Sequence, residues 1–366
     1  MSQQQFMQNP WSNWMKGEGP DSDIVISTRL RIARNLRQHP FPLLATDSQA
    51  EEVVKKVTEV SESEAMRKRH QLQLIQMDQV NPLEKKVLVE KHLISPHLAE
   101  ESRKGAVLLS KDESVSIMIN EEDHIRIQVL LPGFRLNEAW EVGTKIDDIF
   151  EKHLNYAFDE KRGYLTSCPT NVGTGIRASV MLHLPALVMT QQISRILQAI
   201  NQVGLVVRGI YGEGSEALGN LFQLSNQVTL GMSETDILSN LYGVARQIIE
   251  QERVARQYLL EHTRVSLEDR IFRSYGILLH ARTMESKEAA QRLSDLRLGI
   301  DLGVIPNVSP LVLNELLVTT QPGFLQQHAG QKLTPEQRDE RRARLIRERI
   351  SAGKSPHDSG ISQGNS

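Results

Sequence analysis

The spacing of apolar residues along the chain predicts both helices and strands. Apolar side chains recur at helical spacing over residues 48–68, and residues 137–153 and 190–203 also have a helical pattern. Short apolar runs separated by charged turns, which are typical of antiparallel hairpins, occupy residues 106–110, 114–120 and 125–131. Further strands are expected at 178–184, 205–211 and 221–230. The pattern predicts an antiparallel sheet with helices packed on it, which is an α+β fold.

The pattern changes after Gly231. Ser233 can cap a long helix over about 234–262, with Leu241, Val244 and Ile248 on one stripe. Helical segments continue to about residue 350, and the last of them starts with a cap and a first-turn proline. We therefore predict four parts: a flexible segment 1–22, an α+β domain 23–258, a helical domain 259–350 and a disordered tail 351–366.

Composition and charge exclude several classes of protein. The net charge of −2 gives no global field that attracts nucleic acid or an anionic membrane. No apolar run approaches the roughly 18 residues of a membrane helix, and the N-terminus lacks a signal-peptide pattern. The single cysteine, Cys168, cannot form an internal disulfide, which fits a reducing compartment. We expect a cytoplasmic protein without a membrane or direct nucleic-acid partner.

A pair of arginines lies in the segment 27–31, STRLR, which follows the short apolar strand 24–26. If the strand continues, Arg29 and Arg31 point to the same face, because side chains repeat every two residues. Adjacent guanidinium groups repel each other unless an anion lies between them, and arginine binds phosphate with forked, charge-assisted hydrogen bonds. The segment therefore predicts a polyphosphate site, although a solvated basic edge strand has the same pattern.

An acidic turn, NEEDH at residues 120–124, joins two of the predicted strands, and Arg126 follows it. Consecutive acidic residues in a hairpin turn are usually exposed to solvent. Carboxylates at this point are also suited to holding a cationic substrate or to taking a proton from it.

Two glycine-containing segments complete the set. In CPTNVGTGIR, residues 168–177, the glycines let the backbone approach a ligand closely. Cys168 is then either a small inert hydrophobic residue or an activated thiolate. In RGIYGEGSE, residues 208–216, the glycines give Glu213 a mobile loop that closes over a substrate, or simply form a flexible turn. The spacing fits neither a dinucleotide-binding fingerprint nor the motifs of ordinary protein kinases.

These four segments, STRLR, NEEDHIR, CPTNVGTGIRAS and RGIYGEGSE, together resemble the phosphagen (guanidino) kinase family, over about residues 24–255. The resemblance implies that residues 23–258 form a phosphagen-kinase-like catalytic domain. It also implies transfer of the γ-phosphoryl group of ATP, with Mg²⁺, to a guanidinium group. By the same resemblance the catalytic residues are Glu122, Glu121, Glu213 and Cys168. The implied nucleotide-binding residues are Ser27, Thr28, Arg29, Leu30, Arg31, His92, Arg126, Arg177, Ala178, Ser179, Val180, Met181, Arg208, Gly209, Ile210, Tyr211, Gly212 and Glu213. No protein ligands of a metal are expected.

The chain departs from ordinary phosphagen kinases in the position of its helical part. In those enzymes a helical domain precedes the first arginine motif and encloses the small substrate, whereas here the helical domain follows. This order is similar to that of the bacterial protein-arginine kinases. The segment 338–343, RDERRA, also resembles their motif for sensing phosphoarginine, through Arg338, Asp339 and Arg342. The other interpretation is a solvated basic helix end.

The resemblance further implies a role in protein quality control. Phosphoarginine would mark proteins for an AAA+ unfoldase–protease, and a heat-shock repressor would be one target. A small zinc-binding activator protein and self-association as a dimer or larger oligomer through the helical domain are expected. Two alternatives stay open, a kinase for free arginine and a non-catalytic adaptor that binds phosphoarginine.

Overall fold

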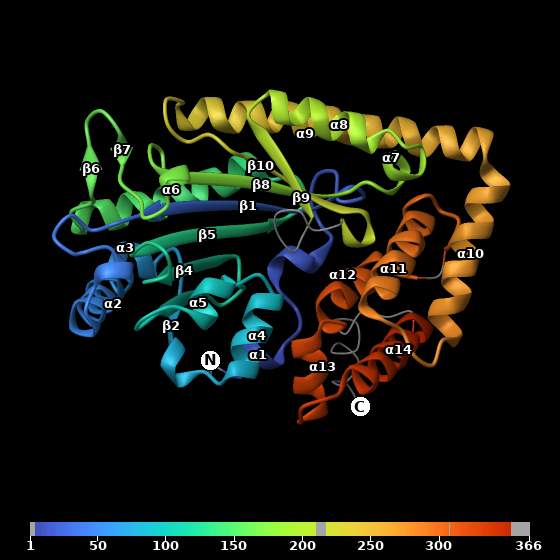
Figure 1. Cartoon of the computed structure of the whole chain (residues 1–366), viewed down its shortest axis with the longest axis horizontal. Coiled ribbons are helices and arrows are strands. Elements are labelled where there is room, and N and C mark those ends of the chain that lie inside the picture. Colours follow the sequence, from blue (N-terminus) through green and yellow to red (C-terminus); the bar gives the residue numbers. More distant parts are fainter. Residues whose placement is uncertain (1–3, 210–216, 307, 353–366) are drawn as a thin grey trace, which may run out of the picture.

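An antiparallel sheet of eight strands forms the core of the N-terminal part. The structure is a computed structural model that describes residues 4–209, 217–306 and 308–352. The strands lie in the order β2-β3-β4-β5-β1-β8-β10-β9 (Figure 1), and every neighbouring pair is antiparallel. Their bounds are β1 Val25–Arg34, β2 Leu72–Gln76, β3 Ala106–Ser110, β4 Val115–Ile119, β5 Ile125–Pro132, β8 Ile176–His183, β9 Leu205–Gly209 and β10 Leu221–Asn226. A small separate hairpin joins β6 Phe158–Asp159 to β7 Gly163–Tyr164.

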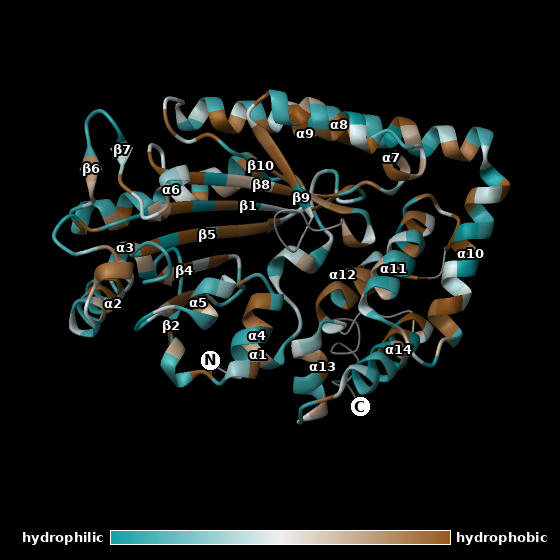
Figure 2. Cartoon of the chain, viewed as in Figure 1, coloured by the Kyte–Doolittle hydropathy of each residue, from teal (hydrophilic) through white to brown (hydrophobic). Residues whose placement is uncertain are grey.

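The two faces of the sheet have different surroundings. On one face, alternate residues of β1 such as Leu30 and Ile32 belong to the main hydrophobic core. Helix α6 (Leu136–His153) packs there so closely that a Cβ on Gly143 would come within 2.6 Å of the Leu30 side chain. The other face packs against side chains of short elements, namely the 3-10 helix η1 (Asn13–Lys16), α4 (Pro82–Glu90) and α5 (Pro96–Glu100). In Figure 2, β5 and β9 are largely hydrophobic.

Within the described residues the predicted strands and helices of this part are present, with small differences, and positions 210–211 of the predicted strand 205–211 lie outside those residues. β10 ends at Asn226, earlier than expected, because the Asn226 side chain bonds to the backbone of β8. The helix expected over 48–68 is broken, since Ser63 caps a new turn. The structure has α2 Asp47–Ser61, α3 Glu64–Arg67, α7 Pro185–Met189 and α8 Ile193–Gln202. The short elements β2, α4, α5 and α7 were not predicted.

The N-terminal segment differs from the expectation of a flexible end. In its described part, helix α1 (Gln4–Gln8) and η1 contribute buried side chains, and Trp14 is only 1% exposed. Lys91 is fully buried beneath this segment and donates hydrogen bonds to the carbonyl oxygens of Phe6 and Asn9. It also forms an ion pair with Glu113. The apolar residues interspersed in this polar stretch therefore anchor residues 4–22 to the sheet.

The C-terminal part is helical. Beyond β10 the described residues contain no strand, as predicted, and α9 runs from Glu234 to His262 across the expected boundary at residue 258. The helices that follow are α10 Arg264–His280, α11 Ser286–Asp301, α12 Pro310–Thr319, α13 Pro322–Ala329 and α14 Pro335–Ala352. Figure 2 shows that α14 is mostly hydrophilic. Among the described residues, none of the helices combines the length and apolar character needed to cross a lipid bilayer.

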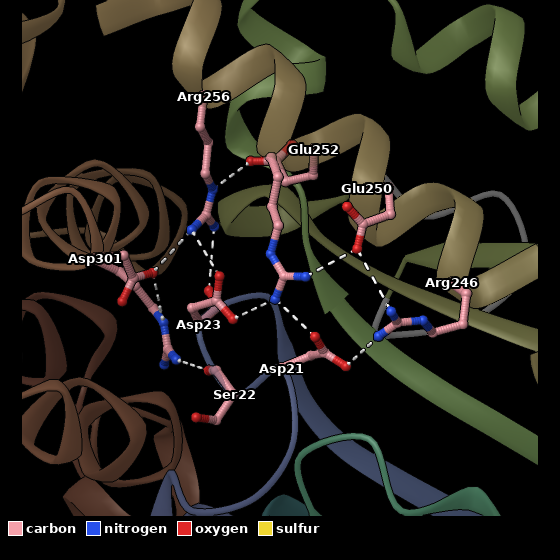
Figure 3. A network of polar contacts seen from close by, with 10 residues as sticks. Asp21, Ser22, Asp23, Arg246, Glu250, Glu252, Arg256 and Asp301 are labelled. Carbon is pink, nitrogen blue, oxygen red and sulfur yellow. Dashed lines mark hydrogen bonds and ion pairs between the residues drawn. The ribbon is translucent and has the colours of Figure 1, made fainter.

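A network of ion pairs and hydrogen bonds joins the two parts just before β1 (Figure 3). Asp21 accepts hydrogen bonds from Arg246 at 3.0 Å and from Arg253 at 2.7 Å, both on α9. Arg297 of α11 donates to the carbonyl oxygen of Ser22 at 2.8 Å. The network also includes Asp23, Glu250, Glu252, Arg256 and Asp301. It fixes the start of β1, and with it the position of Arg29 and Arg31, relative to α9 and α11.

Candidate active site

Five arginines lie on one face of the sheet, namely Arg29, Arg31, Arg126, Arg177 and Arg208. Strand register places Arg31 opposite Arg177 of β8 and opposite Gln128 of β5. Arg29 and Arg126 share this face, because they lie an even number of positions from Arg31 and Gln128. Arg34, three residues beyond Arg31, points to the other side, where its guanidinium forms a buried ion pair with Asp147 at 2.7 Å. The period of two along a strand thus separates the site arginines from a structural one.

The arginines on this face repel each other. The pKa of Arg29 falls to about 10 because of burial and the nearby charges of Arg126 and Arg177. Burial and the charges of these arginines, Arg29 first, also lower the pKa of Arg31, and its buried Nε has no hydrogen-bond partner in the described structure. Arg29 donates one hydrogen bond, at 2.8 Å, to the side chain of Gln223 on β10. Such a concentration of buried positive charge is stabilised by a polyanion.

A cavity of about 420 Å³ opens over this face. Of the predicted nucleotide-binding residues, it is lined by Arg29, Arg31, His92, Arg126, Met181, Arg208 and Gly209. Ser179 faces Arg29 in the strand register, whereas Thr28 donates a hydrogen bond to the carbonyl oxygen of Gly133. Leu30, Ala178 and Val180 pack in the core on the opposite face, so their side chains support the site rather than line it. Ser27 is buried. Ile210, Tyr211, Gly212 and Glu213 lie outside the described residues.

The acidic turn lies beside the arginines. The buried carboxylate of Glu121 forms an ion pair with Arg126 and accepts a hydrogen bond from the Ser95 hydroxyl. Burial raises the pKa of Glu121, but Arg126 and the hydrogen bonds outweigh this, so the net pKa is lowered. Glu121 is therefore ionised and orients Arg126.

Glu122 has a different environment. Within the described part of the chain, no hydrogen bond or ion pair involves its carboxylate, which is half-buried. Burial, together with the neighbouring charges of Glu121 and Asp123, raises the pKa of Glu122, and Arg126 only partly offsets this. A carboxylate that is available and has a raised pKa is suited to accept a proton.

Asp123 ties the acidic turn to the segment that carries Cys168. Its carboxylate accepts hydrogen bonds from the Asn35 side chain at 2.6 Å and from the backbone N–H of Ser167 at 2.7 Å. The thiol of Cys168 is half-buried, and its Sγ lies 3.0 Å from the Thr170 hydroxyl. Through Ser167, the structure brings the segment that carries Cys168 next to the acidic turn.

The rest of the segment 168–177 is tightly packed. Gly173 has a φ of 113°, and a Cβ there would lie 2.3 Å from the carbonyl oxygen of Thr229, so only glycine fits. The Thr229 hydroxyl in turn bonds to the backbone of this segment at Thr170 and Val172. Gly173 therefore allows close packing against residues that follow β10, and Gly175 allows close packing against Ala33 and Arg34 of β1.

His92 lies at the other side of the cavity from the sheet. Its carbonyl oxygen accepts a hydrogen bond from Gln128 at 2.7 Å, and its ring packs edge-on against Trp14 with the ring centres 5.4 Å apart. Burial and the charge of Arg29 lower the pKa of His92 to about 4, so the imidazole is neutral at pH 7. Sequence reasoning missed Trp14, Gln128 and Gln223. Only Gln128 carries a local signal, since it follows Arg126 by two positions on the same strand.

Glu90, at the end of α4, also lines the cavity and was missed. Its carboxylate accepts hydrogen bonds from the backbone N–H groups of Gly323 at 2.7 Å and Phe324 at 3.0 Å. These two groups belong to the first turn of α13, where a helix leaves N–H groups without partners inside the helix. Glu90 therefore links the catalytic part to the helical part.

The link through Glu90 predicts a pH-dependent stability. Burial raises the pKa of its carboxyl from the ordinary 4.5 to about 7, despite the two hydrogen bonds. Between these values the folded state keeps a proton that the unfolded state loses, so this contribution to the free energy of unfolding decreases as pH rises from about 5 to 8. Glu90→Gln removes the contribution. Denaturant titrations at both pH values should show the wild type losing stability relative to Glu90→Gln, and an unchanged difference would contradict the pKa.

The three predicted phosphoarginine-sensing residues lie together on α14. Arg342 is only 2% exposed and donates hydrogen bonds to the carbonyl oxygens of Thr320 at 3.0 Å and Met284 at 2.8 Å. It also pairs with Asp339, while Arg338 donates to the carbonyl oxygen of Leu333 at 3.0 Å. Arg342 is therefore not a solvated residue at a basic helix end. It is part of the packing between α11, α12 and α14.

The described residues contain no group of three or more His, Cys, Asp or Glu side chains arranged to hold a metal ion. The arginine-lined cavity fits phosphate groups instead. A metal ion at such a site would be bound mainly through phosphate oxygens and water, which is the usual way in which Mg²⁺ is held in enzymes that use nucleotides.

Two protein families match the chain, one over each part. The family described as "ATP:guanido phosphotransferase, C-terminal catalytic domain" matches residues 52–255, and "Protein-arginine kinase McsB C-terminal domain" matches residues 264–360. A "Protein-arginine kinase" of Brevibacillus brevis is 93% identical over 350 residues, which are 96% of this chain and 98% of that protein. A protein of the same name from Halalkalibacterium halodurans is 65% identical over the same shares of both chains.

Solved structures show the same fold. Lombricine kinase has a TM-score of 0.56 at 24% sequence identity, covering 65% of this chain and 68% of its own. The duplicated taurocyamine kinase from Schistosoma mansoni, with bound components of a transition state analog, has a TM-score of 0.57 at 24% identity. That match covers 69% of this chain and 37% of the taurocyamine kinase. At these identities the likeness concerns the fold alone, and it confirms the expected α+β architecture.

Proposed function

The chain belongs to the ATP:guanido phosphotransferase family, and we propose that it transfers the γ-phosphoryl group of ATP to arginine side chains of proteins. The observation that carries this proposal is the position of Glu122, an available carboxylate with a raised pKa close to Arg126, one of the arginines that line the cavity. The two features fit the two substrates, a guanidinium group and a polyphosphate.

The arrangement suggests how the residues act. Arg29, Arg31 and Arg126 hold the phosphates and offset the charge that develops on the transferred group. A guanidinium is protonated at neutral pH and is a poor nucleophile. Glu122 orients it and accepts a proton as a guanidinium nitrogen bonds to the γ-phosphorus and the bond to the leaving ADP breaks. Mg²⁺ on the phosphates would further offset their charge.

Arginine in a protein, rather than free arginine, is the acceptor that the relatives favour. Proteins named protein-arginine kinase match both the catalytic and the helical parts at 93% and 65% identity. Initial rates with free arginine and with an unfolded arginine-rich protein distinguish the two acceptors. Faster turnover of free arginine would contradict the proposal, and persistence of full transfer in Glu122→Ala would remove the assignment of the base.

We also propose that Arg338, Asp339 and Arg342 sense phosphoarginine. The support is their position on one stretch of α14, where cationic and anionic side chains lie together. Arg338→Ala combined with Asp339→Ala should abolish stimulation by added phosphoarginine and keep most of the rate measured without it. Kinase rates with and without free phosphoarginine test this. A response equal to that of the wild type would rule out the sensor.

The finer biological role is proposed from the family resemblance alone. Phosphoarginine would mark substrates, including a heat-shock repressor, for an AAA+ unfoldase–protease in the cytoplasm. A small zinc-binding protein would activate the kinase, and the helical part would mediate assembly into a dimer or larger oligomer. Phosphoproteomics and size-exclusion chromatography with light scattering test the targets and the oligomeric state.

A further inference from the structure

The side chains that line the cavity differ between its two ends. Arg177 and Arg31 face each other near the acidic turn, Arg29 comes two positions further along β1, and Met181 comes four positions beyond Arg177 along β8. Leu221 of β10 lies further in the same direction, since it pairs with His183. A strand rises about 3.3 Å per residue, so the cavity extends by roughly 13 Å along the strands from the level of Arg31 to that of Met181. Arg208 of β9 also lines the cavity and lies level with Met181, because both pair with Gln223 of β10. Beyond this level the sheet contributes the apolar side chain of Leu221, so this is the apolar end of the cavity.

The apolar end has walls from both parts of the molecule. The catalytic part contributes Trp14, Met181 and Leu221. The helical part contributes Ala290 and Leu293 of α11 and Val318 of α12. Thr320 and Gln321, which follow α12, and Ser286 at the start of α11 also line the cavity. An apolar slot with a few polar groups fits a planar base and a sugar better than it fits phosphate.

Several contacts hold the helical wall in place. Glu90 bonds to the first turn of α13, and a Cβ on Gly323 would lie 2.6 Å from the Glu90 carboxylate, so glycine is needed for this approach. The Ser294 hydroxyl of α11 lies 2.8 Å from His183 and accepts a hydrogen bond from Asn220 at 2.7 Å. The wall is therefore positioned by buried contacts with the catalytic part, not by a flexible connection.

The wall is also joined to α14. Arg342 donates hydrogen bonds to the carbonyl oxygens of Thr320 and Met284. Thr320 lines the cavity, and Met284 lies two residues before Ser286, which also lines it. The backbone N–H of Met284 donates in turn to the carbonyl oxygen of Asp339 at 3.1 Å. Both ends of the wall thus depend on the same stretch of α14.

We propose that the base and ribose of ATP bind between Trp14, Met181 and the helical part, so that α11 and the end of α12 form one wall of the nucleotide site. The inference rests on ATP being the phosphoryl donor. It assigns to the helical part a direct role in binding the nucleoside.

The test compares ATP with inorganic tripolyphosphate, which carries the phosphates without the nucleoside. Ala290→Phe places a large side chain in the slot, and overpacking of this kind should weaken ATP binding by roughly tenfold or more. Tripolyphosphate should bind this variant as it binds the wild type. The control is Glu288→Phe, at an exposed position of α11 that does not line the cavity, and it should bind both ligands normally. Isothermal titration of the full-length protein measures all constants.

The outcomes separate the two proposals. Unchanged ATP binding in Ala290→Phe overturns the proposal that the helical part forms a wall of the nucleotide site. A wild type that does not bind ATP at all contradicts the proposed function. If Ala290→Phe loses both ligands because its packing fails, Ser286→Phe decides, since Ser286 is exposed and tolerates a larger side chain. Selective loss of ATP in Ser286→Phe supports the wall, and equal loss or no loss of the two ligands overturns it.

Discussion

Glu122→Gln should lower the rate of phosphoryl transfer by about 10²–10⁴-fold, the usual contribution of a positioned acid or base. The substitution keeps the shape of the side chain but removes its charge and its ability to take a proton. Because burial and the neighbouring acidic residues raise the pKa of Glu122, the wild-type rate should also fall as the pH drops below that pKa. Arg126 and the cavity are unaffected, so ATP should still bind.

Steady-state kinetics over a range of pH, with ATP binding measured separately, check this prediction. Glu141→Gln is the matched control, since Glu141 is an exposed glutamate on α6 that is distant from the acidic turn in sequence. It should retain the wild-type rate. A fully active Glu122→Gln, or one that fails only because ATP no longer binds, would mean that Glu122 is not the base.

The second large effect concerns two arginines of the same strand. Arg31→Gln should reduce the rate by about 10²–10³-fold, as expected when one preorganised charged donor is removed from a transferring group. The same change should stabilise the protein without ligand. Arg31 lies among Arg29, Arg126 and Arg177, and burial together with the repulsion from these charges lowers its pKa.

Arg34→Gln provides the contrast. Its guanidinium pairs with Asp147 at 2.7 Å, and both side chains are nearly buried. Removing one partner of a buried ion pair lowers the free energy of unfolding by about 3–5 kcal/mol, so this variant should be less stable than the wild type. Denaturant unfolding of both variants without ATP measures the effect. A loss of stability in Arg31→Gln as large as in Arg34→Gln would mean that no repulsion exists at the site.

Local sequence patterns predict the arginine face well. The period of two along a strand places Arg29 with Arg31 and separates both from Arg34. The charged turns predict the hairpins β3–β4 and β4–β5, which carry the acidic turn and Arg126. Side chains within one strand or one turn are related by geometry that depends on the backbone alone, and this is why these features follow from the sequence.

Contacts between distant segments do not follow in this way. Gln223 bonds to Arg29 although 194 positions separate them, and Glu90 bonds to Gly323 across 233 positions. Neither residue has a neighbour in sequence that indicates its partner. The packing of Trp14 against the sheet was missed for the same reason, because a polar stretch with scattered apolar residues has no helical or strand period. The helical wall of the cavity also depends entirely on tertiary packing.

The chemical stability of the transferred phosphate shows directly whether the acceptor is an arginine nitrogen. The protein is incubated with γ-labelled ATP and a generic unfolded protein, and the product is divided between acid and alkali. We expect label that is lost in acid, survives alkali and is located on arginine by mass spectrometry, because the bond formed is N–P. Label that is stable in acid would indicate phosphorylation of a hydroxyl group and would contradict the assignment of the site.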